Sequence, residues 1–231
     1  HLSNPSLRHM NILHENRDII LMGVLLMPLA GQTIVASDEF TYIAADQLTA
    51  INLAVTGAAG NRATVISQYP VWPNIIKYSN DNSGFAEPKY IWDSTTTDNQ
   101  VRAFAAFSGG IGGGESSLTV DINLTVFADN AHVARLDVYD LSGQNPAFIT
   151  TLTPPVLTDG SMDANTGLVE ILPYNWQNIR IYNISSNPLP AGGIYGILAS
   201  FTVVNYLGPK PPVTPGNPAG LMFYANINFF N

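Results

Sequence analysis

The clearest pattern of hydrophobic and polar positions lies in residues 117–128, SLTVDINLTVFA. Every second residue from Leu118 to Val126 is apolar, and the residues between them are Thr, Asp or Asn. This period of two is typical of a strand with one buried and one wet face. A helix would spread the same apolar side chains around its circumference. The pattern therefore predicts a strand that needs an apolar layer opposite it.

Short apolar or alternating runs, separated by turn-forming residues, predict further strands along the chain. These runs are residues 33–36, 40–44, 48–55, 63–69, 71–78, 90–92, 101–107, 135–141, 148–152, 168–172, 179–184, 195–206 and 221–230. The best helical alternative is residues 46–56, DQLTAINLAVT. We expect an all-β fold, an antiparallel two-sheet β-sandwich, jelly-roll-like or another Greek key, with extended N- and C-terminal segments.

The sequence suggests four parts. Residues 1–36 form an N-terminal arm or first strand, 37–207 the sandwich core, 208–220 a Pro-rich connector and 221–231 a terminal strand. The apolar run at 19–30 is too short for a spanning helix, which needs about 20 residues. Acidic residues at 15 and 18 argue against a signal peptide. A buried strand, a short core helix, an arm docked on a neighbouring subunit and a membrane or signal role stay open for this segment.

The terminal strand follows a connector with five prolines, which favours an extended, semi-rigid arm. Its alternating apolar positions are Leu221, Phe223, Ala225, Ile227 and Phe229. Such a strand either folds back into its own sheet or adds to a sheet edge of another subunit. We take folding back as the first interpretation and keep these five residues as a candidate inter-subunit strand.

Composition limits the classes of function. Charged residues make up 11% of the chain, against roughly 25% in ordinary soluble domains. The formal net charge is −8, and no basic cluster offers a footprint for nucleic acid. The chain has no cysteine, which excludes disulfides, thiolate metal sites and cysteine nucleophiles. The surface is therefore largely uncharged, and direct contact with nucleic acid is not expected.

Catalytic motifs are weak. His132 is interpreted as a loop residue, and no G-x-S-x-G motif accompanies it. The glycine-rich tract 108–114 lacks both a G-K-[ST] motif and a following helix, so it does not indicate a phosphate site. Aromatic residues could form a sugar-stacking platform, although core packing fits them better: Trp72, Trp92, Tyr174 and Trp176. We therefore do not expect an enzyme, and a hydrolase ranks third among the functions considered.

One loop has a pattern of oxygen ligands that suits calcium, which is the one cofactor the sequence suggests. Its candidate ligands alternate along TDGSMDANTG and end at an acid in the twelfth position: Asp159, Ser161, Asp163, Asn165 and Glu170. Ala164 stands at the sixth position, where an EF-hand requires Gly. An Asx-rich hairpin loop is the competing interpretation.

Two N-x-[ST] sequons, at Asn123 and Asn183, are candidate glycosylation sites. They are compatible with an extracellular or virion-surface location, although Asn and Thr are common enough in this chain for chance to supply both.

These observations favour a non-enzymatic structural subunit that self-assembles into a repetitive extracellular or virion structure, a viral capsid or decoration shell or a surface filament. Its expected partners are copies of itself and other shell or filament proteins, with terminal segments making the contacts. The alternative is a carbohydrate- or receptor-binding β-sandwich module.

Overall fold

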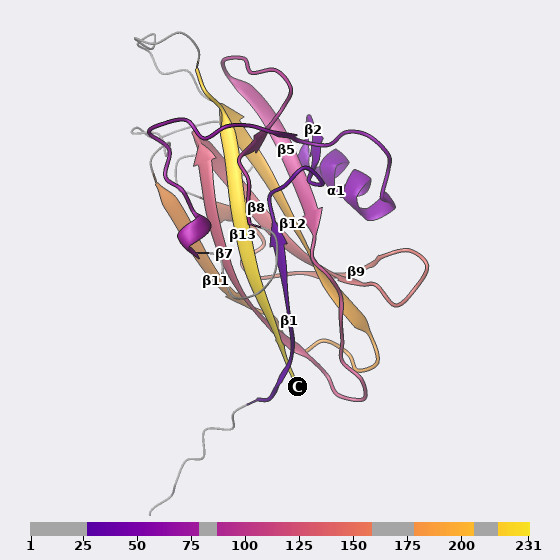
Figure 1. Cartoon of the computed structure of the whole chain (residues 1–231). Coiled ribbons are helices and arrows are strands. Elements are labelled where there is room, and N and C mark those ends of the chain that lie inside the picture. Colours follow the sequence, from indigo (N-terminus) through magenta and orange to yellow (C-terminus); the bar gives the residue numbers. More distant parts are fainter. Residues whose placement is uncertain (1–26, 79–86, 159–177, 206–216) are drawn as a thin grey trace, which may run out of the picture.

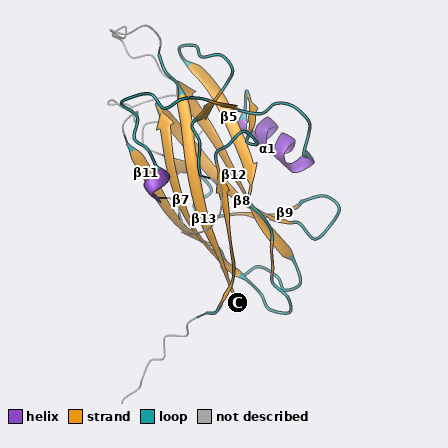
Figure 2. Cartoon of the chain, in the orientation of Figure 1, coloured by secondary structure: helices purple, strands orange, loops and turns teal. Residues whose placement is uncertain are grey.

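The computed structural model describes residues 27–78, 87–158, 178–205 and 217–231. It is nearly all β, with two antiparallel sheets packed face to face, so the predicted sandwich is confirmed. Figures 1 and 2 show the two layers, with the one α-helix of the described residues at the side of the second sheet.

The first sheet, here sheet A, has the strand order β11-β7-β13-β4-β3, with β1 also paired to β13. Its strands are β1 (Leu29–Ala36), β3 (Thr64–Val65), β4 (Ile91–Trp92), β7 (Thr119–Asp129), β11 (Ile179–Ser185) and β13 (Gly220–Phe230). In Figure 1 the yellow β13 runs between β7 and β1.

The second sheet, sheet B, has the order β10-β8-β12-β5-β2, with β9 paired to β8 and β6 to β12. Its strands are β2 (Tyr42–Ala44), β5 (Gln100–Phe107), β6 (Ile111–Gly112), β8 (Ala131–Asp140), β9 (Ala147–Thr151), β10 (Leu157–Thr158) and β12 (Ile194–Asn205). As the apolar character of both its faces predicts, β12 lies inside its sheet, between β8 and β5.

The core lies between the two sheets. The apolar positions of β7 point into it, and Val120, Leu124 and Val126 have no exposed surface. Phe201 of β12 and Phe223 of β13 meet across the layer, with ring centroids 4.4 Å apart. The alternation along residues 117–128 therefore identified both the strand and its buried face.

The strand predicted at 48–55 is wrong, and the helical alternative is correct: α1 spans Gln47–Thr56. Asp46 begins the helix by accepting a hydrogen bond from the Thr49 backbone N–H at 2.9 Å. Gly57 ends it in the left-handed conformation, with a φ of 63°. The helix buries Ala50, Ile51 and Ala54 against the outer face of sheet B. These positions are three or four residues apart or adjacent, which fits a helix and not the period of two expected for a strand.

The strand predicted at 71–78 is also wrong. This segment contains a turn and the short 3₁₀ helix η1 (Ile76–Tyr78). Pro73 supplies no N–H for a sheet ladder, and the Asn74 side chain accepts a hydrogen bond from the Ile76 N–H at 2.8 Å. Residues 63–69 likewise give only the two-residue strand β3. The predicted strand at 168–172 lies outside the described residues.

The terminal strand β13 folds back into its own chain. It pairs with β7 along its whole length, and its other edge is taken by β1 and β4. The five apolar residues proposed for an inter-subunit contact all point into the core and are buried. Within this chain β13 therefore adopts the folded-back alternative, with β7 on one edge and β1 and β4 on the other. Contact or exchange of this strand between copies stays a prediction.

Candidate functional site

One half of the outer face of sheet A carries rows of polar side chains, most of them amides. In the first row, Asn183 of β11 lies opposite Asn123 of β7, which lies opposite Asn226 of β13. A parallel row joins β11 to β1 through Ser185, Asp121, Asn228 and Gln32. We call these seven residues the amide face. The two rows cross four strands, so the surface is built by sheet register and not by a loop.

Side-chain hydrogen bonds hold the rows together. Asn123 Nδ2 donates to Asn183 Oδ1 at 2.7 Å, and Gln32 Nε2 donates to Asn226 Oδ1 at 2.7 Å. Both bonds are solvent-exposed, and they order the amide groups across strand pairs β7–β11 and β1–β13. Asp121 is the one acidic residue among the seven.

The other half of the same face is covered by the chain between β3 and β5. Trp72 packs there against Tyr90 and Phe127, with ring centroids 5.4 and 5.5 Å away. We call this buried cluster the capped half, and its core residues are Trp72, Ile75, Tyr90, Phe127, Met222 and Tyr224. Trp72 lies so close to Gly220 that an added Cβ would come within 2.6 Å of its ring.

A buried carboxyl group lies in the capped half. Asp129 is 3% exposed and its Oδ2 accepts a hydrogen bond from Trp72 Nε1 at 3.0 Å. Burial raises the pKa of Asp129 to about 7, because desolvation disfavours the carboxylate more than the Trp72 hydrogen bond favours it. The group links the cap to the end of β7 and lies away from the amide face.

Both candidate glycosylation sites are on the amide face. Asn123 and Asn183 are exposed cross-strand neighbours, a proximity that the sequence alone does not reveal. The nitrogen that donates to Asn183 is the Asn123 Nδ2 atom, to which a glycan would attach. A glycan here would replace one of the two hydrogens on this nitrogen and cover the amide face; its presence stays a prediction.

The other predicted sites lie either outside the described residues or in the core. The calcium loop, with Asp159, Ser161, Asp163, Asn165 and Glu170, lies outside the described residues, as do Tyr174 and Trp176. Among the residues that are described, no group of three or more His, Asp or Glu could hold a metal ion. Trp72 and Trp92 are core residues, 4% and 0% exposed, so neither offers a stacking surface.

His132 is a fully buried residue of β8 and not the loop residue that was expected. Its Nε2 lies 2.9 Å from the Tyr182 hydroxyl of β11, across the sandwich.

No described helix is both long and apolar enough to cross a membrane.

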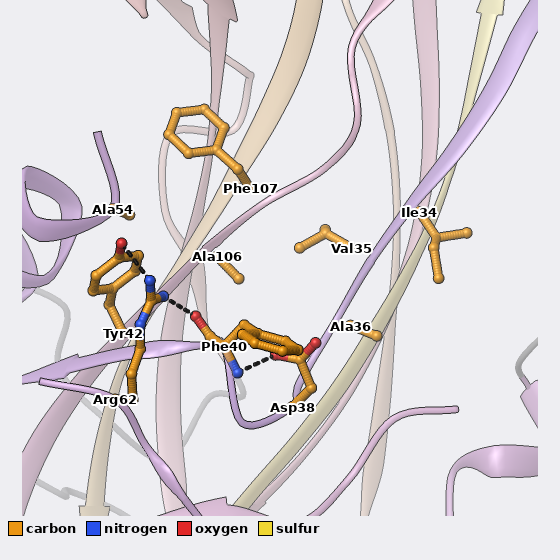
Figure 3. Close-up of a pocket in the computed structure, with 10 residues that line it drawn as sticks. All are labelled: Ile34, Val35, Ala36, Asp38, Phe40, Tyr42, Ala54, Arg62, Ala106 and Phe107. Carbon is orange, nitrogen blue, oxygen red and sulfur yellow. Dashed lines mark hydrogen bonds between the residues drawn. The ribbon is translucent and has the colours of Figure 1, made fainter. Parts of the chain in front are cut away.

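A cleft of about 320 Å³ lies beside β1, β5 and α1 (Figure 3). Arg62 stacks on the Tyr42 ring, with its guanidinium carbon 3.4 Å from the centroid. Its Nη2 donates to the Tyr42 hydroxyl at 2.6 Å and its Nη1 donates to the Phe40 carbonyl. Because both terminal nitrogens are used within the chain, Arg62 fastens the start of β2 and does not present a recognition group.

The sequence matches no protein-family model and no curated protein. Several solved structures show distant likenesses to the chain. The K3 cleaved adhesin domain of Lys-gingipain from Porphyromonas gingivalis is 13% identical, with a TM-score of 0.32, over 64% of this chain and 76% of that one. TmCBM61 in complex with beta-1,4-galactotriose is 8% identical, with a TM-score of 0.29, over 88% and 90%.

A third likeness, to a structure of infectious bursal disease virus Gx strain, is 13% identical with a TM-score of 0.26 and covers 88% of this chain and 51% of that one. At these identities and TM-scores, the likenesses carry no inference about function.

Proposed function

We propose that this protein is a non-enzymatic structural subunit that self-associates through the amide face, in a repetitive structure of a virion or an extracellular surface. The observation that carries the proposal is the pair of cross-strand rows containing four Asn and one Gln side chain on one exposed sheet face. Copies of the chain are the proposed partners, and other shell or filament proteins would be further ones. Nucleic acid is not among them.

The energetics of the amide face suit contact between copies. Depletion of charged residues distinguishes the buried centre of protein interfaces, because charges are expensive to desolvate. Amide groups carry both donors and acceptors, so two such faces can pair with each other in several alignments. The two internal amide bonds already order Asn123, Asn183, Asn226 and Gln32, which lowers the entropy lost on association.

The experiment compares the wild-type protein with Asn123→Lys by size-exclusion chromatography with light scattering and by negative-stain microscopy. We expect regular particles or fibres for the wild type and a shift to monomers for the variant, because the lysine places a charge in the contact. Asn145→Lys is the matched control, since Asn145 is exposed in the turn between β8 and β9. A wild-type protein that stays monomeric at high concentration would refute self-assembly.

A further inference from the structure

A second polar site lies on the outer face of sheet B, beside the start of α1. Its cavity has a volume of about 210 Å³. The lining residues come from α1, from β8 and β9, and from the chain that follows β9: Gln47, Val133, Ala134, Arg135, Thr151, Pro155 and Val156. This volume is below the roughly 300 Å³ at which sites for drug-sized ligands begin, so the cavity suits a ligand of one ring or smaller.

Arg135 is held in this cavity by a buried carboxylate. Asp137 has no exposed surface, and its Oδ1 accepts hydrogen bonds from Arg135 Nε at 2.8 Å and from Thr151 Oγ1 at 2.6 Å. Thr151 lies opposite Asp137 on the neighbouring strand. The carboxylate thus fixes the guanidinium from behind, and strand pairing fixes the carboxylate.

The terminal nitrogens of Arg135 make no hydrogen bond within the described residues, unlike those of Arg62 and Arg102. Arg62 uses both Nη atoms within the chain, and Arg102 uses Nη1 on the Val101 carbonyl while its Nε binds Asp93 at 2.5 Å. Within the described residues, only the Nε of Arg135 is engaged. Its two Nη groups are left as an oriented fork at a side chain that is 38% exposed.

Gln47 supplies a second oriented group. Its Nε2 donates to Ser200 Oγ at 3.1 Å, and Ser200 has no exposed surface. The bond leaves Gln47 Oε1 as an acceptor at the rim of the same cavity. Val133, Pro155 and Val156 supply an apolar wall. The site therefore combines a donor fork, an acceptor and a hydrocarbon surface.

We propose that this cavity binds one neutral sugar ring. A pair of ring hydroxyls would accept from the Arg135 fork and donate to Gln47 Oε1, while the C–H face would rest on Val156 and Pro155. An anionic ligand fits less well, because Asp137 neutralises Arg135, Asp46 precedes Gln47, and the chain has a net charge of −8. The site faces away from sheet A, so the proposal does not depend on self-association.

The test measures binding of methyl glycosides of glucose, galactose and mannose by ligand-observed NMR titration. We expect at least one of them to bind the wild type, and Arg135→Lys to weaken that binding by about tenfold or more because a lysine has no fork. Arg102→Lys is the matched control and should bind as the wild type does. Gln47→Ala should also weaken binding, and it removes no buried charge.

Three results would overturn the proposal. The first is that no methyl glycoside binds the wild type. The second is that glucuronate or sulfate binds more tightly than every neutral glycoside, which would make the cavity an anion site. The third is that Arg135→Lys and Gln47→Ala bind with wild-type affinity.

Discussion

The two halves of the outer face of sheet A rest on the same strands and differ in what covers them. At one end, Trp72, Tyr90 and Phe127 form a buried aromatic cluster. At the other end, Asn123, Asn183 and their neighbours stay exposed. A single strand contributes to both, since on β7 the outward residue Thr125 is 1% exposed while Asn123, two residues earlier, is open to solvent.

The capped half is therefore expected to stabilise the fold, and the amide face to make contacts between copies. The capped half buries large aromatic area and so contributes to the free energy of unfolding. The amide face contributes little, because exposed hydrogen bonds between neutral side chains exchange readily with water. Substitutions in the two halves should therefore have different consequences. Those in the capped half should lower the stability of the fold, and those on the amide face should weaken association.

The largest effect is expected for Trp72→Ala. It empties the centre of the capped half, removes the hydrogen bond to Asp129 and should lower the free energy of unfolding by about 3–5 kcal/mol. Asn123→Ala should change it by less than about 0.5 kcal/mol. Urea denaturation of both variants measures the contrast, and equal losses would show that the two halves do not differ in stability.

The next effect is a pH dependence that comes from Asp129. Its folded pKa of about 7 lies above the ordinary aspartate value of 3.8, so its contribution to stability is full below pH 3.8 and is lost as the pH rises through 7. The loss amounts to about 4 kcal/mol at most. Asp129→Asn should therefore gain stability relative to the wild type from pH 5 to pH 8, measured by denaturation at each pH. A constant difference would mean that Asp129 does not titrate in this range.

A smaller effect is expected for Gly220→Ala. The added methyl group would approach the Trp72 ring to 2.6 Å, and crowding of this kind typically costs about 1–3 kcal/mol. Gly143→Ala in the turn between β8 and β9 is the control, because its nearest contact would be an ordinary 3.5 Å. Thermal unfolding of both variants tests whether Trp72 packs directly on β13.

The sequence predicted the two-sheet sandwich, because the alternation of apolar and polar residues along a strand shows which of its faces is buried. It identified β7, β12 and β13 with their ends within two residues. It gave α1 only as the alternative to a strand, because the signals there were the caps Asp46 and Gly57 and not periodicity. The sequence could not show which part of the outer face of sheet A is covered, because Trp72 packs on β7 from a segment that is distant in the sequence.

The amide face could not be predicted from the sequence for a similar reason. Each strand shows its own polar positions, but only the pairing register places Asn183, Asn123 and Asn226 in one row. The alternation along β13 is compatible both with folding back and with a contact between subunits. Pairing with β7 and β1 shows that the strand folds back within this chain.

The most direct test of the amide face as a contact surface uses the absence of cysteine from the chain. Asn123→Cys and Asn145→Cys each introduce a single thiol, whose reaction rate with a thiol reagent is measured on dilute and on assembled protein. We expect Cys at position 123 to react about tenfold or more slowly in the assembled protein, while the thiol at position 145 reacts at one rate throughout. An unchanged rate at position 123 in assembled protein would contradict the account.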